Sequence, residues 1–229
     1  MKEDLSPPPT TVILSRLEAR YGVPHWFPRL DPLEELISCI LSQNTSDVNS
    51  FRAFDRLKAT YPKWEQALEA PVEDLADSIR SGGLANSKAP RIQAVLKEIL
   101  ALRGDLTLDF LEAKSDAEAR AWLMALPGVG PKTAAIVLCF AMGRPVLPVD
   151  THVFRVAWRL GLIEKKIGEF KAHDALQAQI APEQTYRFHV ALITHGRQVC
   201  KALTPRCPDC PLTDLCKYYK EGNGLPDAK

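Results

Sequence analysis

The sequence lacks several features that mark common protein classes. No stretch of its 229 residues approaches the roughly 20 apolar residues that a membrane-spanning helix needs, so we expect no membrane association. The first ten residues, MKEDLSPPPT, carry acids and three consecutive prolines where a secretory signal has a basic start and an apolar core. We interpret them as a loose tail and expect a cytoplasmic protein.

The chain also lacks any period-two run long enough for a β-strand, and no repeat of solenoid length is present. Apolar positions at spacings of three and four, or good helix formers, predict helices instead. The predicted helices are 33–42, 48–59, 72–79, 86–102, 117–125, 132–142, 151–160, 169–180 and 184–199. Pairs such as Gly82-Gly83 and Pro127-Gly128 separate them. The predicted fold class is therefore all-α.

The strong positive charge of many DNA-binding domains is absent too, since the formal net charge is only +1. The charges are unevenly distributed, however. Segment 127–160 has four basic residues against one acidic residue, and segment 197–220 has five against two. Two basic segments on a neutral protein suit a surface that meets phosphate, with chance clustering as the alternative.

Residues 122–134, WLMALPGVGPKTA, predict a tight turn between two helices. Pro127-Gly128 ends the first helix, Gly130 can cap the second, and Pro131 suits its first position. Backbone N–H groups at such a turn can hold a phosphate group. A nucleotide-binding P-loop is excluded because proline, not glycine, precedes Lys132. A purely structural turn remains the alternative.

Lys132 and Asp150 are the candidate catalytic residues. Lys132 falls in the first turn of the second helix, whose partial positive charge favours a neutral amine that can attack a sugar carbon and form a Schiff base. The alternative is a surface lysine that at most touches phosphate. Asp150 precedes a helical pattern that begins at Val153 and is a predicted N-cap. An ionised Asp150 could stabilise an oxocarbenium-like transition state or help deprotonate an amine, but its position is equally compatible with a cap alone.

The six cysteines divide into two groups. Cys39 and Cys139 lie in apolar helical segments and are predicted to be inert core residues. The other four have the spacing C-x6-C-x2-C-x5-C and are Cys200, Cys207, Cys210 and Cys216. Without a secretion signal we expect no disulfides, so four neighbouring thiolates predict a metal site. The single C-x2-C pair disfavours zinc without excluding it, and the spacing leaves zinc and iron–sulfur both open.

LPGVGPKTA at 126–134, VDTH at 149–152 and the cysteine spacing, in this order, resemble the endonuclease III family of helix-hairpin-helix DNA glycosylases and AP lyases. The resemblance covers about residues 30–217. It implies two helical lobes flanking a DNA-binding cleft, a barrel of residues 31–144 and an iron–sulfur lobe of residues 1–30 and 145–229. It further implies a [4Fe–4S] cluster on the four cysteines. The implied protein is a nucleoid-associated monomer of prokaryotic type, and its partner is double-stranded DNA with damaged bases or abasic sites.

The same resemblance assigns roles to individual residues. Lys132 and Asp150 fall on the catalytic lysine and aspartate, and Asp47 and His152 fall on polar pocket positions. For His152, helix capping or core packing is the alternative. The implied DNA contacts are the gap fillers Gln43 and Asn44, the wedge Leu84, the hairpin residues Gly128 and Gly130, and the loop cations Arg206 and Lys201. The chain departs from the family at Met124, where members carry glutamate, and in the filler segment, where the glutamine is displaced by one position.

The joint match predicts a bifunctional glycosylase for oxidised pyrimidines, which acts through a Lys132 Schiff base and nicks the strand by β-elimination. One alternative is a monofunctional mismatch or uracil glycosylase, because the filler segment departs from the family pattern. A second is a non-catalytic DNA-binding iron–sulfur module, which would need neither Lys132 nor Asp150.

Overall fold

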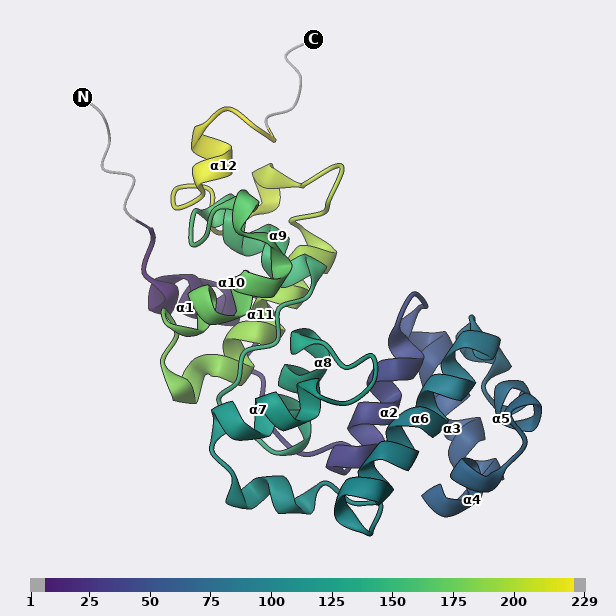
Figure 1. Cartoon of the computed structure of the whole chain (residues 1–229). Coiled ribbons are helices and arrows are strands. Elements are labelled where there is room, and N and C mark those ends of the chain that lie inside the picture. Colours follow the sequence, from purple (N-terminus) through teal and green to yellow (C-terminus); the bar gives the residue numbers. More distant parts are fainter. Residues whose placement is uncertain (1–6, 225–229) are drawn as a thin grey trace. The chain divides into compact units, whose positions relative to one another are not determined.

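The structure, a computed structural model, describes residues 7–224 of the chain (Figure 1). Within that range every regular element is a helix, which confirms the all-α prediction. None of these helices is long and apolar enough to cross a bilayer. The chain divides into two compact units. We call residues 27–144 the hairpin unit, and residues 1–26 with 145–229 the cysteine unit.

The hairpin unit is built around a buried helix. Its α-helices are α2 (Pro32–Ser42), α3 (Asp47–Thr60), α4 (Trp64–Glu69), α5 (Val72–Ser78), α6 (Ala85–Arg103), α7 (Asp116–Met124) and α8 (Pro131–Ile136). Helix α2 begins sharply because Asp31 accepts a hydrogen bond from the Glu34 backbone N–H at 2.8 Å and proline occupies its first position. It packs against α3, α6 and α8, so it positions both the loop at its own end and the hairpin before α8.

Short 3₁₀ turns lie between the α-helices of both units. The 3₁₀ turns are η1 (Arg80–Gly82), η2 (Asp109–Ala113), η4 (Lys165–Ile167), η5 (Pro182–Gln184) and η6 (Cys207–Asp209). Helix α8 continues directly into a π-helical turn, η3 (Val137–Ala141), so the single helix predicted for 132–142 changes its hydrogen-bond pattern midway. Such π turns are rare and occur mostly as single insertions, often at functional sites.

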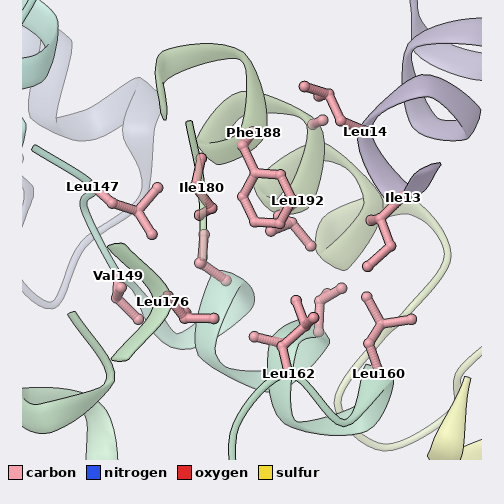
Figure 2. Packing of buried hydrophobic residues seen from close by; sticks show 14 of the residues in the cluster. Ile13, Leu14, Leu147, Val149, Leu160, Leu162, Leu176, Ile180, Phe188 and Leu192 are labelled. Carbon is pink, nitrogen blue, oxygen red and sulfur yellow. The ribbon is translucent and has the colours of Figure 1, made fainter. Parts of the chain in front are cut away.

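The cysteine unit contains α1 (Thr10–Tyr21), α9 (Thr151–Leu160), α10 (Gly168–Gln177), α11 (Thr185–Gln198) and α12 (Lys217–Lys220). Helices α1 and α9 both pack on α11. Figure 2 shows the apolar core between them, to which Ile13, Leu160 and Phe188 contribute from these three helices. Three of the four clustered cysteines, Cys200, Cys210 and Cys216, pack against this core, so it supports the cysteine loop.

The prediction of a loose tail over the first ten residues is wrong at its last residue. Residues 1–6 lie outside the described part of the chain. Thr10 is the first residue of α1, is buried, and donates its hydroxyl to the Gln179 carbonyl at 2.8 Å. This contact joins the start of α1 to the turn after α10, two segments far apart in the sequence.

Candidate active site

The hairpin turn lies between Met124, where α7 ends, and Pro131, where α8 begins. Gly130 is the N-cap of α8, as predicted. The backbone requires glycine at Gly128, whose φ is 72° and where an added Cβ would lie 3.0 Å from Cδ of Arg91. At Gly130, φ is −96° and a Cβ would meet nothing within 4 Å. The fold of this unit therefore demands only the first of the two glycines, and Gly130 leaves its face of the turn open.

Lys132 is exposed in the first turn of α8, the helix that packs against α2. The positive charge of Lys132 acts on the pKa of Cys39 on that neighbouring helix. Burial raises the pKa of the Cys39 thiol far above its ordinary value, the Glu35 carboxylate raises it further, and Lys132 opposes both effects. Cys39 is thus the inert core thiol that the sequence predicts, and the Lys132 side chain lies near it.

Glu35 is a buried acid that sequence reasoning missed. Its side chain on α2 lies 3.5 Å from the Arg29 guanidinium and is 5% exposed. One carboxylate oxygen, Oε2, has no hydrogen-bond partner among the described residues. Burial raises the pKa of Glu35, and Arg29 lowers it by a smaller amount. In the sequence Glu34 and Glu35 resemble ordinary first-turn acids, and only packing on both sides of α2 distinguishes them.

The predicted wedge and filler residues lie in two loops of the hairpin unit. Leu84 is 58% exposed, as a wedge would have to be. Asn44 is exposed as well, whereas Gln43 is half-buried and accepts a 2.6 Å hydrogen bond from Arg91. Because Arg91 also lies against Gly128, it links the filler loop to the hairpin. Asp47 stands exposed at the first position of α3.

In the cysteine unit, Asp150 is the N-cap of α9, as predicted. Its Oδ1 accepts a hydrogen bond from the Val153 backbone N–H at 2.7 Å, and the residue is only 7% exposed. Two residues along the chain, His152 is half-buried and its Nδ1 accepts from Arg155 at 3.0 Å. Arg155 also donates to the Cys200 carbonyl at 2.9 Å, so the segment that carries Asp150 is tied to the cysteine loop.

The four clustered cysteines line one cavity, together with Arg159 and His195. Groups that can donate hydrogen bonds surround the sulfurs. Arg159 lies 3.3 Å from Sγ of Cys200, and the Leu212 backbone N–H lies 3.4 Å from Sγ of Cys210. Burial raises the pKa of Cys210 to about 11. Across residues 7–224, no three His, Cys, Asp or Glu side chains converge as ligands of a single ion.

This donor set suits thiolate ligands. No carboxylate lines the cavity within the described residues, and the guanidinium and N–H groups at the sulfurs stabilise negative charge there. Arg159 is 5% exposed and also donates to the carbonyls of Lys201 and Ala202 at 2.8 and 2.9 Å. Arg159 thus fixes the loop that carries the first cysteine, a role that no local sequence pattern indicates.

The two predicted loop cations lie on the surface of the cysteine loop. Arg206 donates to the Gln198 carbonyl at 2.7 Å, and its Nε lies 4.0 Å from the Asp209 carboxylate. Its side chain is nevertheless 57% exposed. Lys201 is exposed as well. Both side chains are therefore accessible to an anionic partner.

Known proteins are similar to this chain in sequence and in architecture. Residues 37–182 match the family described as HhH-GPD superfamily base excision DNA repair protein. Endonuclease III of Escherichia coli is 37% identical over 212 residues, which is 91% of this chain and 95% of that protein. Endonuclease III of Thermotoga maritima is 34% identical over 198 residues, 85% and 88% of the two chains. A relative from Arabidopsis thaliana is 39% identical over 190 residues, 79% of this chain, and this chain spans 64% of its length.

Solved structures of endonuclease III are also similar to this chain. A non-covalent complex of endonuclease III with DNA superimposes with a TM-score of 0.78 at 32% identity, covering 93% of this chain and 95% of that one. A trapped covalent endonuclease III–DNA intermediate gives the same TM-score and identity over 94% and 99% of the two chains.

Proposed function

Because this chain belongs to the HhH-GPD superfamily of base excision DNA repair proteins, and within it to the endonuclease III family, we propose that it excises oxidised pyrimidines from double-stranded DNA. It is a DNA glycosylase with associated AP lyase activity. The observation that carries the proposed chemistry is Lys132, exposed in the first turn of α8 directly after the hairpin. An amine there is accessible to a nucleotide that has been turned out of the base stack.

Lys132 is the proposed nucleophile. Its neutral amine attacks C1′ of the damaged nucleotide, the bond from C1′ to the base breaks, and the base leaves with the bonding electrons. The amine that remains on C1′ loses a proton and forms a Schiff base as the sugar ring opens. The Schiff base acidifies the C2′ hydrogen, and its loss expels the 3′ phosphate by β-elimination. The strand is then nicked 3′ to the lesion, without hydrolysis by a metal-bound water.

Asp150 is the proposed electrostatic partner. The Val153 N–H at the start of α9 donates to Oδ1 of Asp150 and fixes the orientation of its carboxylate. A buried negative charge stabilises the positive charge that develops on the sugar as the base departs. It can also accept a proton from the attacking amine. His152, held by Arg155, is proposed to support proton movement beside it.

The four clustered cysteines are proposed to hold a [4Fe–4S] cluster through their thiolates. The four cysteine sulfurs that line one cavity and the hydrogen-bond donors around them support this assignment. When bound, the cluster would supply a rigid centre for the loop that carries Lys201 and Arg206. Purified protein should be coloured and contain iron and sulfide. A colourless protein containing only zinc would contradict the assignment.

A covalent trapping experiment tests the nucleophile. Borohydride reduction during reaction with a thymine glycol or dihydrouracil duplex should leave the protein bound to DNA. Lys132→Gln should abolish trapping, whereas Lys97→Gln, at an exposed position on α6, should leave it intact. Trapping that survives Lys132→Gln would remove this residue from the role.

A substrate panel tests the reaction class. Thymine glycol, dihydrouracil, uracil, mismatched adenine and a bare abasic site should be compared with base release and nicking measured separately. Release of uracil or a mismatched base without nicking would favour the monofunctional alternative. That alternative draws on the filler loop, where Gln43 is held by Arg91 and Asn44 is the exposed amide. Binding that ignores lesions, with no base release, would favour the non-catalytic module.

A further inference from the structure

Two residues of the hairpin unit adopt the left-handed backbone conformation, which is strained for leucine and less costly for asparagine. Asn44 has a φ of 55° and Leu84 a φ of 52°. Among the described residues, these are the two non-glycine positions with positive φ. Such strain persists only where the surrounding structure holds it in place. Both residues are also among those expected to enter DNA, so the contacts that hold them matter for function.

The side chain of Lys88 binds backbone carbonyls shortly before both Asn44 and Leu84. Nζ of Lys88 donates to the carbonyl of Leu41 at 2.6 Å and to the carbonyl of Gly82 at 2.8 Å. Leu41 lies in the last turn of α2, three residues before Asn44, and Gly82 ends η1, two residues before Leu84. The two loops are also neighbours, since a Cβ added at Gly83 would lie 4.0 Å from Oγ1 of Thr45.

Lys88 is buried, and burying a lysine costs free energy unless its amine donates hydrogen bonds. The residue is 3% exposed, and burial lowers the pKa of its amine. Within residues 7–224 its hydrogen-bond partners are these two carbonyls, and no carboxylate pairs with it. Carbonyls at the ends of helical segments lack partners along the helix and carry partial negative charge. Lys88 satisfies two such carbonyls from different segments at once.

We propose that Lys88 is a positioning residue that holds the loop after α2 and the turn after η1 as one rigid element, so that Leu84 and the filler residues enter the DNA together. The inference rests on the proposed function and concerns the turning-out of the damaged nucleotide, not the bond-breaking step. Without the link, Leu84 would relax from its strained conformation and the loop at Asn44 would lose its fixed geometry, so the wedge side chain would no longer be held in position.

The proposal predicts a defect that depends on how tightly the lesion is paired. Lys88→Met introduces an apolar side chain of similar length and removes the hydrogen-bond donors. Single-turnover base release should fall on the order of 10- to 100-fold when the lesion lies opposite a normal base. The loss should be much smaller when the lesion lies opposite an abasic site, because that nucleotide is already loosened. Lys97→Met, at an exposed position on the same helix, is the matched control.

A double-mutant cycle shows whether Lys88 acts through the wedge. Leu84→Ala should reduce release from the paired duplex, and adding Lys88→Met should cause little further loss. Additive losses, or a Lys88→Met defect that is the same on both duplexes, would overturn the proposal. Circular dichroism and urea unfolding should establish that each variant is folded. Lys88→Gln, which keeps one donor group on a shorter chain, is the second variant.

Native-state hydrogen exchange on the unmodified protein tests the link without any substitution. If Lys88 joins the two loops, amides in 43–46 and 83–86 should open together with one common opening equilibrium. Independent opening would contradict the proposal. Failure of the proposed function looks different, because the unmodified protein would then release no base from either duplex while the exchange result still decides whether the loops are coupled.

Discussion

Asp150 caps α9 and also supplies the proposed negative charge, and two substitutions can separate these roles. An asparagine oxygen can accept the same 2.7 Å hydrogen bond from the Val153 N–H. Asp150→Asn should therefore change the free energy of unfolding by less than about 1 kcal/mol, since both residues are good N-caps. It removes the negative charge, so single-turnover base release should fall roughly 100-fold or more.

Asp150→Ala serves as the comparison because it removes the cap as well. It should show the same kinetic defect and, in urea unfolding, an additional loss of about 0.5–2 kcal/mol. Full activity in the asparagine variant would reduce Asp150 to a structural cap.

Glu35 gives the protein a pH dependence whose sign can be worked out. Burial raises the pKa of this carboxyl above its ordinary value of 4.5. The folded state therefore binds the proton more tightly than the unfolded state, and the contribution of Glu35 to stability falls as pH rises through the raised pKa. Glu35→Gln should be more stable than the parent near neutral pH, and the difference should shrink below the ordinary pKa.

Urea unfolding over a series of pH values measures this difference. Glu98→Gln, at an exposed position on α6, should show no such trend. A stability difference that stays constant with pH would mean that the substitution acts through packing and not through ionisation.

At the scale of elements, the apolar pattern predicted most helices because most of them bury one face. The predicted 33–42 and 151–160 correspond to α2 (Pro32–Ser42) and α9 (Thr151–Leu160). Helices α1, α4 and α12 were missed, the last two because six and four residues are too few for a helical period to appear. The π turn after α8 was missed because it changes hydrogen bonding without changing the apolar spacing.

In the candidate site, the residues that could be predicted depend on their sequence neighbours, and the residues that were missed depend on contacts far along the chain. Gly130 and Asp150 were predicted as caps because capping depends on neighbouring residues alone. Lys88 was missed because its partner Leu41 is 47 residues away, and a lysine within a helix of mixed composition resembles a solvated one. Arg91 and Glu35 were missed for the same reason, since only packing shows what each contacts.

Substitution of the two glycines in the hairpin between α7 and α8 should have different effects on stability and on DNA affinity. Gly128→Ser places a Cβ where φ is 72° and Arg91 is 3.0 Å away, and should destabilise the fold by roughly 1–2 kcal/mol. Gly130→Ser meets nothing within 4 Å and introduces a good N-cap, so stability should be retained. DNA affinity should nevertheless fall, because the new side chain blocks backbone approach to a phosphate.

Urea unfolding and a DNA-binding titration on the same two variants check this pattern. Unchanged affinity in a folded Gly130→Ser protein would mean that the open face of the turn does not meet DNA.

For the whole molecule, each unit has its own core and supplies one part of the proposed chemistry. The hairpin unit carries Lys132, and the cysteine unit carries Asp150. The net charge of +1 gives the chain little general attraction for DNA. Binding must therefore depend on a small number of local phosphate contacts, each of which should be visible in the salt dependence of affinity.

Arg206 and Lys201 are the contacts for which that dependence is most informative. A side chain that neutralises one phosphate contributes about 0.9 to the slope of log affinity against log salt concentration. Arg206→Ala and Lys201→Ala should each reduce the slope by about that amount, equally for lesion and undamaged duplexes. Arg206 is partly engaged by the Gln198 carbonyl, but its side chain is 57% exposed and can reach a second acceptor. Fluorescence anisotropy over a range of salt concentrations, with Lys171→Ala on α10 as the control, measures the slopes. Weaker binding with an unchanged slope would show that these residues support the loop without touching phosphate.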